Sequence, residues 1–178
     1  PNTIYHGMNH VFRSTNQGDD WERISPDLTH NDPDRLGDIQ FQTITALSES
    51  PITEGLLYAG SDDGRVHITR DGGESWADIS AGLHPDRFTS EVVASEYHES
   101  TVYVTQNGRR SDDFAPYVWR STDYGETWES IADGIPFGPV NIIREDPKNP
   151  SLLYLGNDVG VYVSLNRGGE WHALPEGL

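Results

Sequence analysis

The chain of 178 residues contains no cysteine, a single lysine (Lys148) and a single methionine. The absence of cysteine excludes disulfide bonds and metal sites built from thiolates. No apolar run approaches the roughly 20 residues that a transmembrane helix needs, so we expect no membrane insertion. No stretch has the periodicity of an extended helix either. These absences leave a β-rich chain as the expectation.

Positive charge is also scarce. Twelve basic residues face 29 acidic ones, which gives a net charge of -17. Nucleic acids and anionic membrane surfaces are therefore unlikely partners by charge, and we expect neither. A solvated acidic surface accounts for this composition. Adaptation to high salt is the alternative interpretation, because an acidic surface that is poor in lysine stays hydrated in brine.

One eight-residue pattern occurs four times along the chain. It has Ser or Thr first, Asp or Asn third, Gly fifth and Trp eighth. The copies are STNQGDDW (14–21), TRDGGESW (69–76), STDYGETW (121–128) and SLNRGGEW (164–171). Each copy follows a short apolar run and precedes an alternation of polar and apolar residues, which is typical of a turn between two strands.

The residue types in this pattern predict its turn chemistry. Asp or Asn accepts hydrogen bonds from backbone N–H groups further along the turn, and glycine supplies a positive φ. The tryptophan opens the outgoing strand, and we expect all four indoles to be mostly buried against a neighbouring repeat. The residues with these structural roles are Asn16, Gly18, Trp21, Asp71, Gly73, Trp76, Asp123, Gly125, Trp128, Asn166, Gly168 and Trp171.

These motifs resemble the Asp-box, or BNR, repeat of sialidases, sortilin-type (VPS10) ectodomains and xyloglucanase-like glycosidases. The segments LYAGSDDG (57–64) and LLYLGNDVG (152–160) strengthen the resemblance. It implies an all-β fold of four-stranded antiparallel β-propeller blades, at about 1–25, 40–80, 90–132 and 139–174 in a single domain. It leaves the function open, because the same repeat occurs in enzymes and in receptors.

The first blade has no room for an inner strand before Pro1. We therefore expect an arc of a larger propeller, or half of a dimeric ring. The expected partners are the remainder of a parent propeller or a second copy of the chain. No signal peptide is recognisable in the chain, and the resemblance implies a secreted or cell-envelope protein of a bacterium or archaeon.

Two long polar loops, Pro26 to Gln40 and Gln106 to Pro116, are predicted on the propeller face opposite the repeated turns. Loops of this length in a compact domain are often functional, although a solvated insertion is the plainer interpretation. Their candidate binding residues are Asp32, Asp34, Arg35, Arg109, Arg110, Asp112, Asp113 and Phe114.

Evidence for catalysis or for a metal is weak in the sequence. Glycoside hydrolysis needs a pair of carboxylates. No such pair stands out among so many acids, and Asp38 and Glu91 are only weak candidates. His6 and His10 could approach each other across a short turn, but two histidines make an incomplete zinc site. We expect no cofactor. The sequence favours a non-catalytic module that binds a protein or carbohydrate ligand, with part of a glycoside hydrolase as the alternative.

Overall fold

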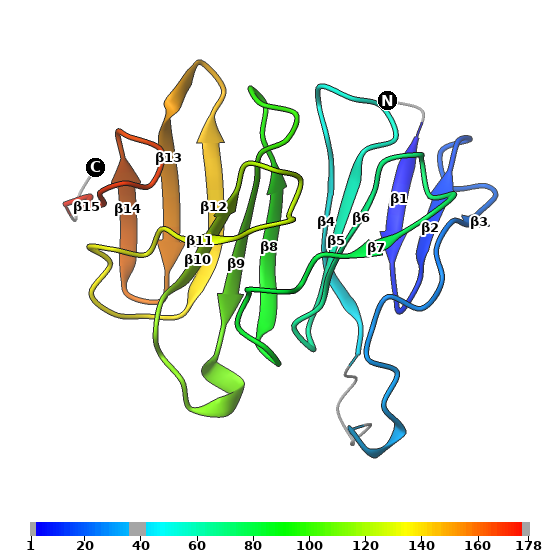
Figure 1. Cartoon of the computed structure of the whole chain (residues 1–178), viewed down its shortest axis with the longest axis horizontal. Helices are drawn as coiled ribbons and strands as arrows, with labels where there is room; N and C mark the ends of the chain where they lie inside the picture. Colours follow the sequence, from blue (N-terminus) through cyan, green and yellow to red (C-terminus); the bar gives the residue numbers. More distant parts are fainter. Residues whose placement is uncertain (1–2, 36–41, 176–178) are drawn as a thin grey trace.

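The fold is all-β. The structure is a computed structural model that describes residues 3–35 and 42–175, and Figure 1 shows their strands standing side by side. The helices in these ranges are the short 3-10 turns η1 (Pro33–Arg35) and η2 (Arg109–Ser111). Neither is long and apolar enough to cross a membrane.

The strands form four antiparallel sheets, which we call blades 1 to 4 in chain order. Blade 1 contains β1 (Ile4–Gly7), β2 (Val11–Ser14) and β3 (Glu22–Arg23). Blade 2 contains β4 (Ile44–Glu49), β5 (Leu57–Ser61), β6 (Val66–Thr69) and β7 (Ala77–Asp78). Blade 3 contains β8 (Phe88–Ala94), β9 (Val102–Asn107), β10 (Tyr117–Ser121) and β11 (Glu129–Ser130). Blade 4 contains β12 (Val140–Asp146), β13 (Asn149–Asn157), β14 (Gly160–Ser164) and β15 (His172–Ala173).

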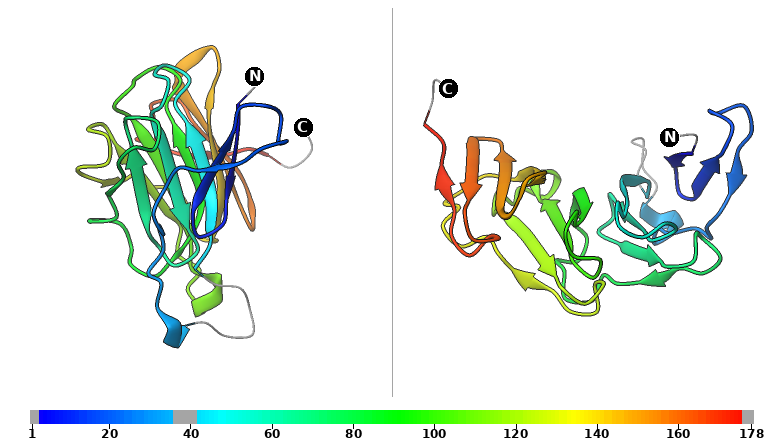
Figure 2. Two further views of the ribbon diagram at one scale, coloured as in Figure 1. Left: turned by 90° about the vertical axis from the view of Figure 1, so that its right-hand side faces the viewer. Right: turned by 90° about the horizontal axis from the view of Figure 1, so that it is seen from above.

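In every blade each strand pairs with its neighbour in sequence, so the blades are simple up-and-down sheets. The blades follow one another along an arc, with the two termini at its opposite tips (Figure 2). Sheets of this kind arranged along an arc form a partial β-propeller. The predicted all-β blade architecture is confirmed, including a first blade of three described strands.

The hydrophobic core lies between the blades. Tyr58 and Val66 of blade 2 are fully buried against Val92 and Val104 of blade 3. Tyr103 of blade 3 packs against blade 4 in the same way. Because successive side chains of a strand point to opposite faces, blades 2 and 3 each bury one apolar face against the blade before and the other against the blade after.

The four repeated turns share one set of hydrogen bonds. The hydroxyl at the first position donates to the carboxylate or amide oxygen at the third, over 2.7 to 2.9 Å. The same hydroxyl accepts the N–H of the glycine at the fifth position. The oxygen at the third position also accepts the N–H of the seventh residue. Asp71 and Asp123 therefore close turns by accepting hydrogen bonds, as Asn16 and Asn166 do.

Backbone strain is shared by two residues in each turn. The glycine has a positive φ, as expected, and so does the residue before it. That residue is Gln17, Tyr124 or Arg167 in three of the turns, each with φ between 61° and 64°. Side chains other than glycine rarely adopt this conformation, so the hydrogen bonds of the turn must hold it in place.

The tryptophans of blades 2 to 4 connect neighbouring blades. The indole N–H of Trp76 donates to the carbonyl of Ile24, that of Trp128 to Ile79 and that of Trp171 to Ile131, over 2.7 to 2.8 Å. Trp171 is 4% exposed, and Trp76 and Trp128 are half-buried. The expectation of burial is wrong for Trp21, which is 45% exposed. Among the described residues no other blade lies against this ring, which packs edge-on against His6.

The two turn aspartates predict a specific pH dependence of stability. Hydrogen bonds, chiefly from the hydroxyls of Ser75 and Thr127, lower the pKa of Asp71 and of Asp123 from 3.8 to about 2. A carboxyl group whose folded pKa lies below its unfolded pKa stabilises the folded protein above the unfolded value, and this contribution is lost as the pH falls through the folded value. We expect the double variant Asp71→Asn, Asp123→Asn to lose less stability than the parent between about pH 4 and pH 2.

Asparagine already occupies the same position at Asn16 and Asn166, so the variant keeps the oxygen that accepts hydrogen bonds. Thermal unfolding from pH 5 to pH 2 measures the effect. Glu126→Gln removes a neighbouring exposed acid and should leave the pH profile of the parent unchanged. Parallel acid unfolding of the parent and the double variant would contradict the role assigned to these carboxylates.

The tryptophan contacts predict unequal costs of truncation. Trp171→Ala should lower the free energy of unfolding by about 3 to 5 kcal/mol, because it empties a buried site between blades 3 and 4. Trp21→Ala should cost about 0.5 kcal/mol or less, because the ring is exposed. Urea denaturation of dilute protein compares the two variants. Equal costs would show that blade 1 buries its tryptophan in solution.

Candidate functional site

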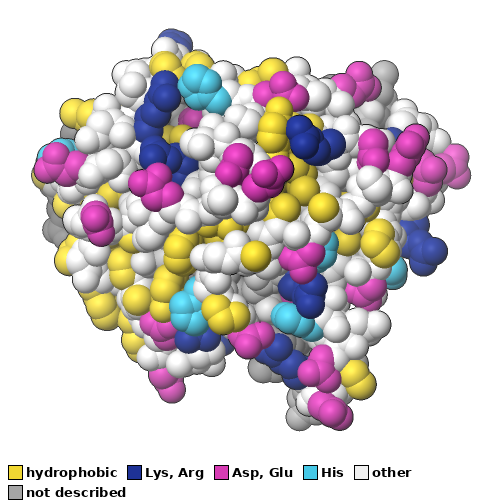
Figure 3. Space-filling view, viewed as in Figure 1, with side chains coloured by type: hydrophobic (Ala, Val, Ile, Leu, Met, Phe, Trp, Pro, Cys, Tyr) yellow, Lys and Arg dark blue, Asp and Glu magenta, His cyan; other side chains and the backbone are white. Residues whose placement is uncertain are grey.

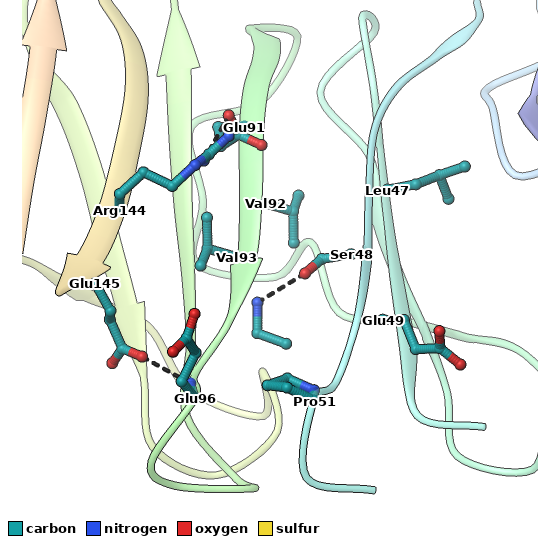
Figure 4. Close-up of a pocket in the computed structure, with 11 residues that line it drawn as sticks. Leu47, Ser48, Glu49, Pro51, Glu91, Val92, Val93, Glu96, Arg144 and Glu145 are labelled. Carbon is teal, nitrogen blue, oxygen red and sulfur yellow. Dashed lines mark hydrogen bonds and ion pairs between the residues drawn. The ribbon is translucent and has the colours of Figure 1, made fainter. Parts of the chain in front are cut away.

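A pocket of about 310 Å³ lies where the inner strands of three blades meet. Its walls come from β4, β8 and β12 and from the residues that follow β4 and β8 (Figure 4). Five of its eleven lining residues are charged, four glutamates and one arginine, namely Glu49, Glu91, Glu96, Glu145 and Arg144. In a propeller, inner strands border the central channel, so this is the channel side of the arc.

Two acids of this pocket, Glu91 and Glu145, have partners within the chain. The Glu91 carboxylate lies 2.8 Å from a guanidinium nitrogen of Arg144. Glu145 is 8% exposed and accepts hydrogen bonds from the Ser95 hydroxyl and the backbone N–H of Glu96, at 2.9 and 2.7 Å. These contacts fix the positions of the Glu91 and Glu145 side chains in the pocket.

Glu49 has a partner outside the pocket. Its carboxylate accepts a hydrogen bond of 3.0 Å from the hydroxyl of Tyr5 in blade 1. Burial, reinforced by this carboxylate, raises the pKa of Tyr5 to about 12. Of the two weak catalytic candidates, Glu91 is thus paired with Arg144, and Asp38 lies outside the described residues.

The short helices η1 and η2 of the two long loops project from the same edge of the molecule, the lower edge of Figure 1. We call this edge the loop face. Arg35 from the first loop and Arg110 from the second line the same pocket of about 220 Å³. Arg35 pairs with Asp86 at 2.8 Å, and Arg110 lies 3.7 Å from buried Asp62. The Arg110 guanidinium also lies 4.9 Å from the centre of the Phe88 ring.

Beside this pocket the loop face carries a chain of polar side chains. The amide of Asn107 donates to Asn141, and the amide of Asn141 donates to Asp158, both over 2.9 Å. Arg109 forms an ion pair with the same aspartate. The hydrogen bonds from Asn141 and Arg109 lower the pKa of Asp158. The chain therefore ends on a carboxylate that stays ionised at neutral pH.

Two exposed phenylalanines adjoin this polar chain. Phe114 and Phe137 stack with their ring centres 6.0 Å apart and are 41% and 53% exposed. Their loops are joined because Gly138 N–H donates to the carbonyl of Phe114. The amide of Asn157 donates to the carbonyl of Phe137, which connects the pair to the turn that holds Asp158. Hydrophobic side chains also gather at the lower left of the space-filling view, while acidic ones are scattered over the face (Figure 3).

The remaining residues predicted for these loops have local roles. Asp113 accepts hydrogen bonds from the hydroxyl of Tyr117 and from Arg87, and the first of these is the main cause of its lowered pKa. Asp32 accepts the N–H of Asp34. Asp112 has a left-handed backbone conformation with φ of 54° at the end of η2.

Sequence reasoning missed several residues of the loop face, among them Arg87, Phe137 and Asp158. They lie in short connections between strands, and only the stacking of blades brings them beside the long loops. No motif in those connections marked these residues as candidates for a binding site.

Comparison with known proteins places the fold. No family model matches the chain. A vacuolar protein sorting/targeting protein 10 from Laccaria bicolor is 28% identical over 145 residues, which are 74% of this chain and 9% of that protein. An oligoxyloglucan-reducing end-specific xyloglucanase from Emericella nidulans is 29% identical over 108 residues, 57% of this chain and 13% of the enzyme. The chain thus spans about a tenth of the length of these curated relatives.

Solved structures resemble almost the whole chain. The GH74 xyloglucanase from Xanthomonas campestris superposes with a TM-score of 0.75 at 19% identity, covering 98% of this chain and 28% of the enzyme. An ancestral GH74 enzyme gives a TM-score of 0.71 at 21% identity, covering 97% of this chain and 22% of that chain. YCF48 from Cyanidioschyzon merolae gives 0.56 at 22% identity, covering 75% and 37%. The chain has the fold of a β-propeller portion.

The two weak metal candidates, His6 and His10, contact different residues. His6 packs against Trp21, whereas His10 packs against Phe12, with its Nδ1 atom 3.2 Å from the carbonyl oxygen of Ser25. The described ranges hold no cluster of three or more metal-ligating side chains.

The channel pocket predicts a difference between its two best-defined acids. Glu145→Ala should lower the free energy of unfolding by about 1 to 3 kcal/mol, because it removes the acceptor of the buried Ser95 hydroxyl and of the part-buried Glu96 N–H. Glu91→Ala should cost less than about 1 kcal/mol, because its arginine partner is half exposed to solvent. Chemical denaturation measures both. The reverse order would mean that Glu91, and not Glu145, is the structural acid.

Proposed function

We propose that this chain is a non-catalytic β-propeller binding module whose loop face binds a glycan. The observation that carries the proposal is the exposed Phe114–Phe137 pair beside the hydrogen-bonded chain of Asn107, Asn141 and Asp158. Aromatic faces pack against the apolar face of a sugar ring, and amides and carboxylates bind its hydroxyls. The blades hold both groups on a rigid support.

The channel pocket supports a binding role over catalysis by this chain. Glycoside hydrolysis uses one carboxyl group as an acid and a second as a base or nucleophile. Glu91 is paired with Arg144, and Glu145 accepts hydrogen bonds from Ser95 and from the backbone N–H of Glu96, so both carboxylates already have partners within this chain. The likeness to xyloglucanases favours a second candidate. In it the chain is part of a glycoside hydrolase, with catalytic carboxylates shared with other segments.

We place the protein outside the cell or in the cell envelope of a bacterium or archaeon, where polymeric glycans are encountered. A polypeptide is the other ligand class that suits the loop face, since Arg109 and Arg110 are more than half exposed. The choice between these ligands rests on the aromatic pair, which a glycan would use most directly.

Calorimetric titration with xyloglucan oligosaccharides tests the proposal. Phe114→Ser and Phe137→Ser should each weaken binding about two- to tenfold, because stacking on an aromatic ring contributes about 0.5 to 1.5 kcal/mol. Ile52→Ser, which changes an equally exposed apolar residue in the β4–β5 connection, should bind like the parent. Unchanged affinity in both phenylalanine variants would contradict the assigned site.

The same titrations separate the candidate functions. Chromatography of the oligosaccharides after long incubation should show no new reducing ends. Cleavage that Glu91→Gln abolishes would establish the glycoside hydrolase instead. Binding of unstructured polypeptides, with no binding to any glycan, would assign the loop face to the other ligand class.

A further inference from the structure

Asn107 is followed by Gly108, and no other asparagine of the chain precedes a glycine. Asn107 is the last residue of β9 and the first member of the polar chain on the loop face. A glycine has no side chain to shield its backbone nitrogen. The nitrogen of Gly108 can therefore attack the side-chain carbonyl carbon of Asn107, Cγ, and close a cyclic imide. The pair is a chemically reactive element within the candidate binding site.

A hydrogen bond holds the Asn107 side chain in the orientation that ring closure needs. Its Oδ1 atom accepts the backbone N–H of Arg109 over 3.0 Å. This Asx turn folds the side chain back along the backbone that follows, which brings Cγ toward the nitrogen of Gly108. The same N–H would stabilise the negative charge that develops on Oδ1 during the attack, as the donors of an oxyanion hole do.

The nitrogen of Gly108 has no competing hydrogen bond. Gly108 is buried, and its N–H donates to no residue that the structure describes. A buried N–H without an acceptor is unfavourable. A bond from this nitrogen to Cγ of Asn107 removes the unpaired N–H, so the fold itself favours ring closure at this position.

The aspartate–glycine pairs of the chain can form the same ring, but their surroundings differ. They lie at 63–64, 71–72 and 133–134. In the first two pairs the N–H of the glycine already donates to a backbone carbonyl, over 3.3 Å for Gly64 and 2.9 Å for Gly72. In the third, the Asp133 side chain makes no hydrogen bond to the described residues, so nothing holds it against Gly134. Asn107 is thus the position that combines a held side chain with an unpaired nitrogen.

The packing of the second long loop requires glycine at position 108. A Cβ atom there would lie 2.7 Å from the carbonyl oxygen of Asp113. The N–H of Asp113 also donates to the carbonyl of Gly108. The loop therefore closes tightly on this residue, and the reactive pair is part of the construction of the loop face.

We propose that Asn107 is a site of spontaneous deamidation in the folded protein. The nitrogen of Gly108 loses its proton and bonds to Cγ of Asn107, while the bond from Cγ to Nδ2 breaks and the amide leaves as ammonia. Water then opens the cyclic imide at either of its carbonyl groups, which leaves aspartate or isoaspartate at position 107. The net reaction is hydrolysis of one amide, with water as the second reactant.

Deamidation would break the polar chain of the loop face. Nδ2 of Asn107 donates to Oδ1 of Asn141 over 2.9 Å, and a carboxylate has no proton to donate in its place. The amide of Asn141 already donates to Asp158, so turning it toward the new carboxylate would release that aspartate. Weaker glycan binding by older molecules is the expected consequence. This consequence rests on the proposed function, whereas the reaction at Asn107 does not.

Peptide mapping by mass spectrometry, after incubation of the folded 178-residue chain at neutral pH, tests the proposal. A synthetic peptide of residues 104–111 is the unfolded reference. We expect Asn107 to lose its amide in the folded chain at a rate at least equal to that in the peptide, with isoaspartate among the products. A slower rate in the folded chain would overturn the proposal. So would aspartate without isoaspartate, because that product indicates direct hydrolysis without the ring.

Asn166 is the matched internal control. Its Oδ1 atom also accepts a backbone N–H within a turn, but the N–H of the next residue, Arg167, donates to the carbonyl of Ser151. Asn166 should keep its amide. Asn107→Gln lengthens the side chain, so the same ring cannot form, and this variant should contain no isoaspartate at position 107. Deamidation of Asn166 as fast as that of Asn107 would overturn the role assigned to the free nitrogen.

Binding measurements separate this inference from the proposed function. Asn107→Asp supplies one product directly, and it should bind xyloglucan oligosaccharides about two- to tenfold more weakly than freshly prepared parent, because one hydrogen bond of the polar chain is lost. Circular dichroism checks that the variant remains folded. Equal binding would overturn the functional consequence. A parent that binds no glycan and still deamidates at Asn107 would refute the proposed function and support the modification site.

Discussion

The contact between each repeated turn and the blade before it determines the rest of the structure. In blades 2 to 4 the turn brings a glycine and a tryptophan to the same isoleucine of the preceding blade, and the indole N–H donates to its carbonyl. This approach requires a residue without a Cβ atom, and the left-handed backbone at the same glycine requires it again. The hydroxyl and the Asp or Asn of the turn hold that backbone in place. The same turn residues therefore determine both the local turn and the packing between blades.

The two edges of the molecule are therefore constrained to different degrees. The edge with the repeated turns is constrained, because a change there alters both a turn and a junction between blades. The loop face carries the opposite connections, which vary in length and hold the exposed phenylalanines and arginines. Function on a propeller is therefore expected where the chain is free to change without loss of packing.

The sequence predicts the parts of this structure that are local. A Ser or Thr, an Asp or Asn, and a glycine at fixed spacing specify each turn, and the alternation around them specifies the strands. The exposure of Trp21 could not be predicted, because it depends on whether another blade lies against blade 1 and not on the residues of its own turn. The left-handed conformation of Tyr124 follows from hydrogen bonds made by its neighbours. The stacking of Phe114 on Phe137 arises from the meeting of two blades.

The charges of the loop face bear on what it can bind. Its arginines already pair with aspartates: Arg35 with Asp86, Arg87 with Asp113 and Arg109 with Asp158. Exposed pairs of this kind contribute only about 0 to 1 kcal/mol to stability, so their main effect is to fix the positions of side chains. An anionic ligand would have to displace a carboxylate from each arginine and would meet the repulsion of a chain with net charge -17. A neutral glycan meets neither cost, because its hydroxyls can add hydrogen bonds to the unused positions of the same side chains.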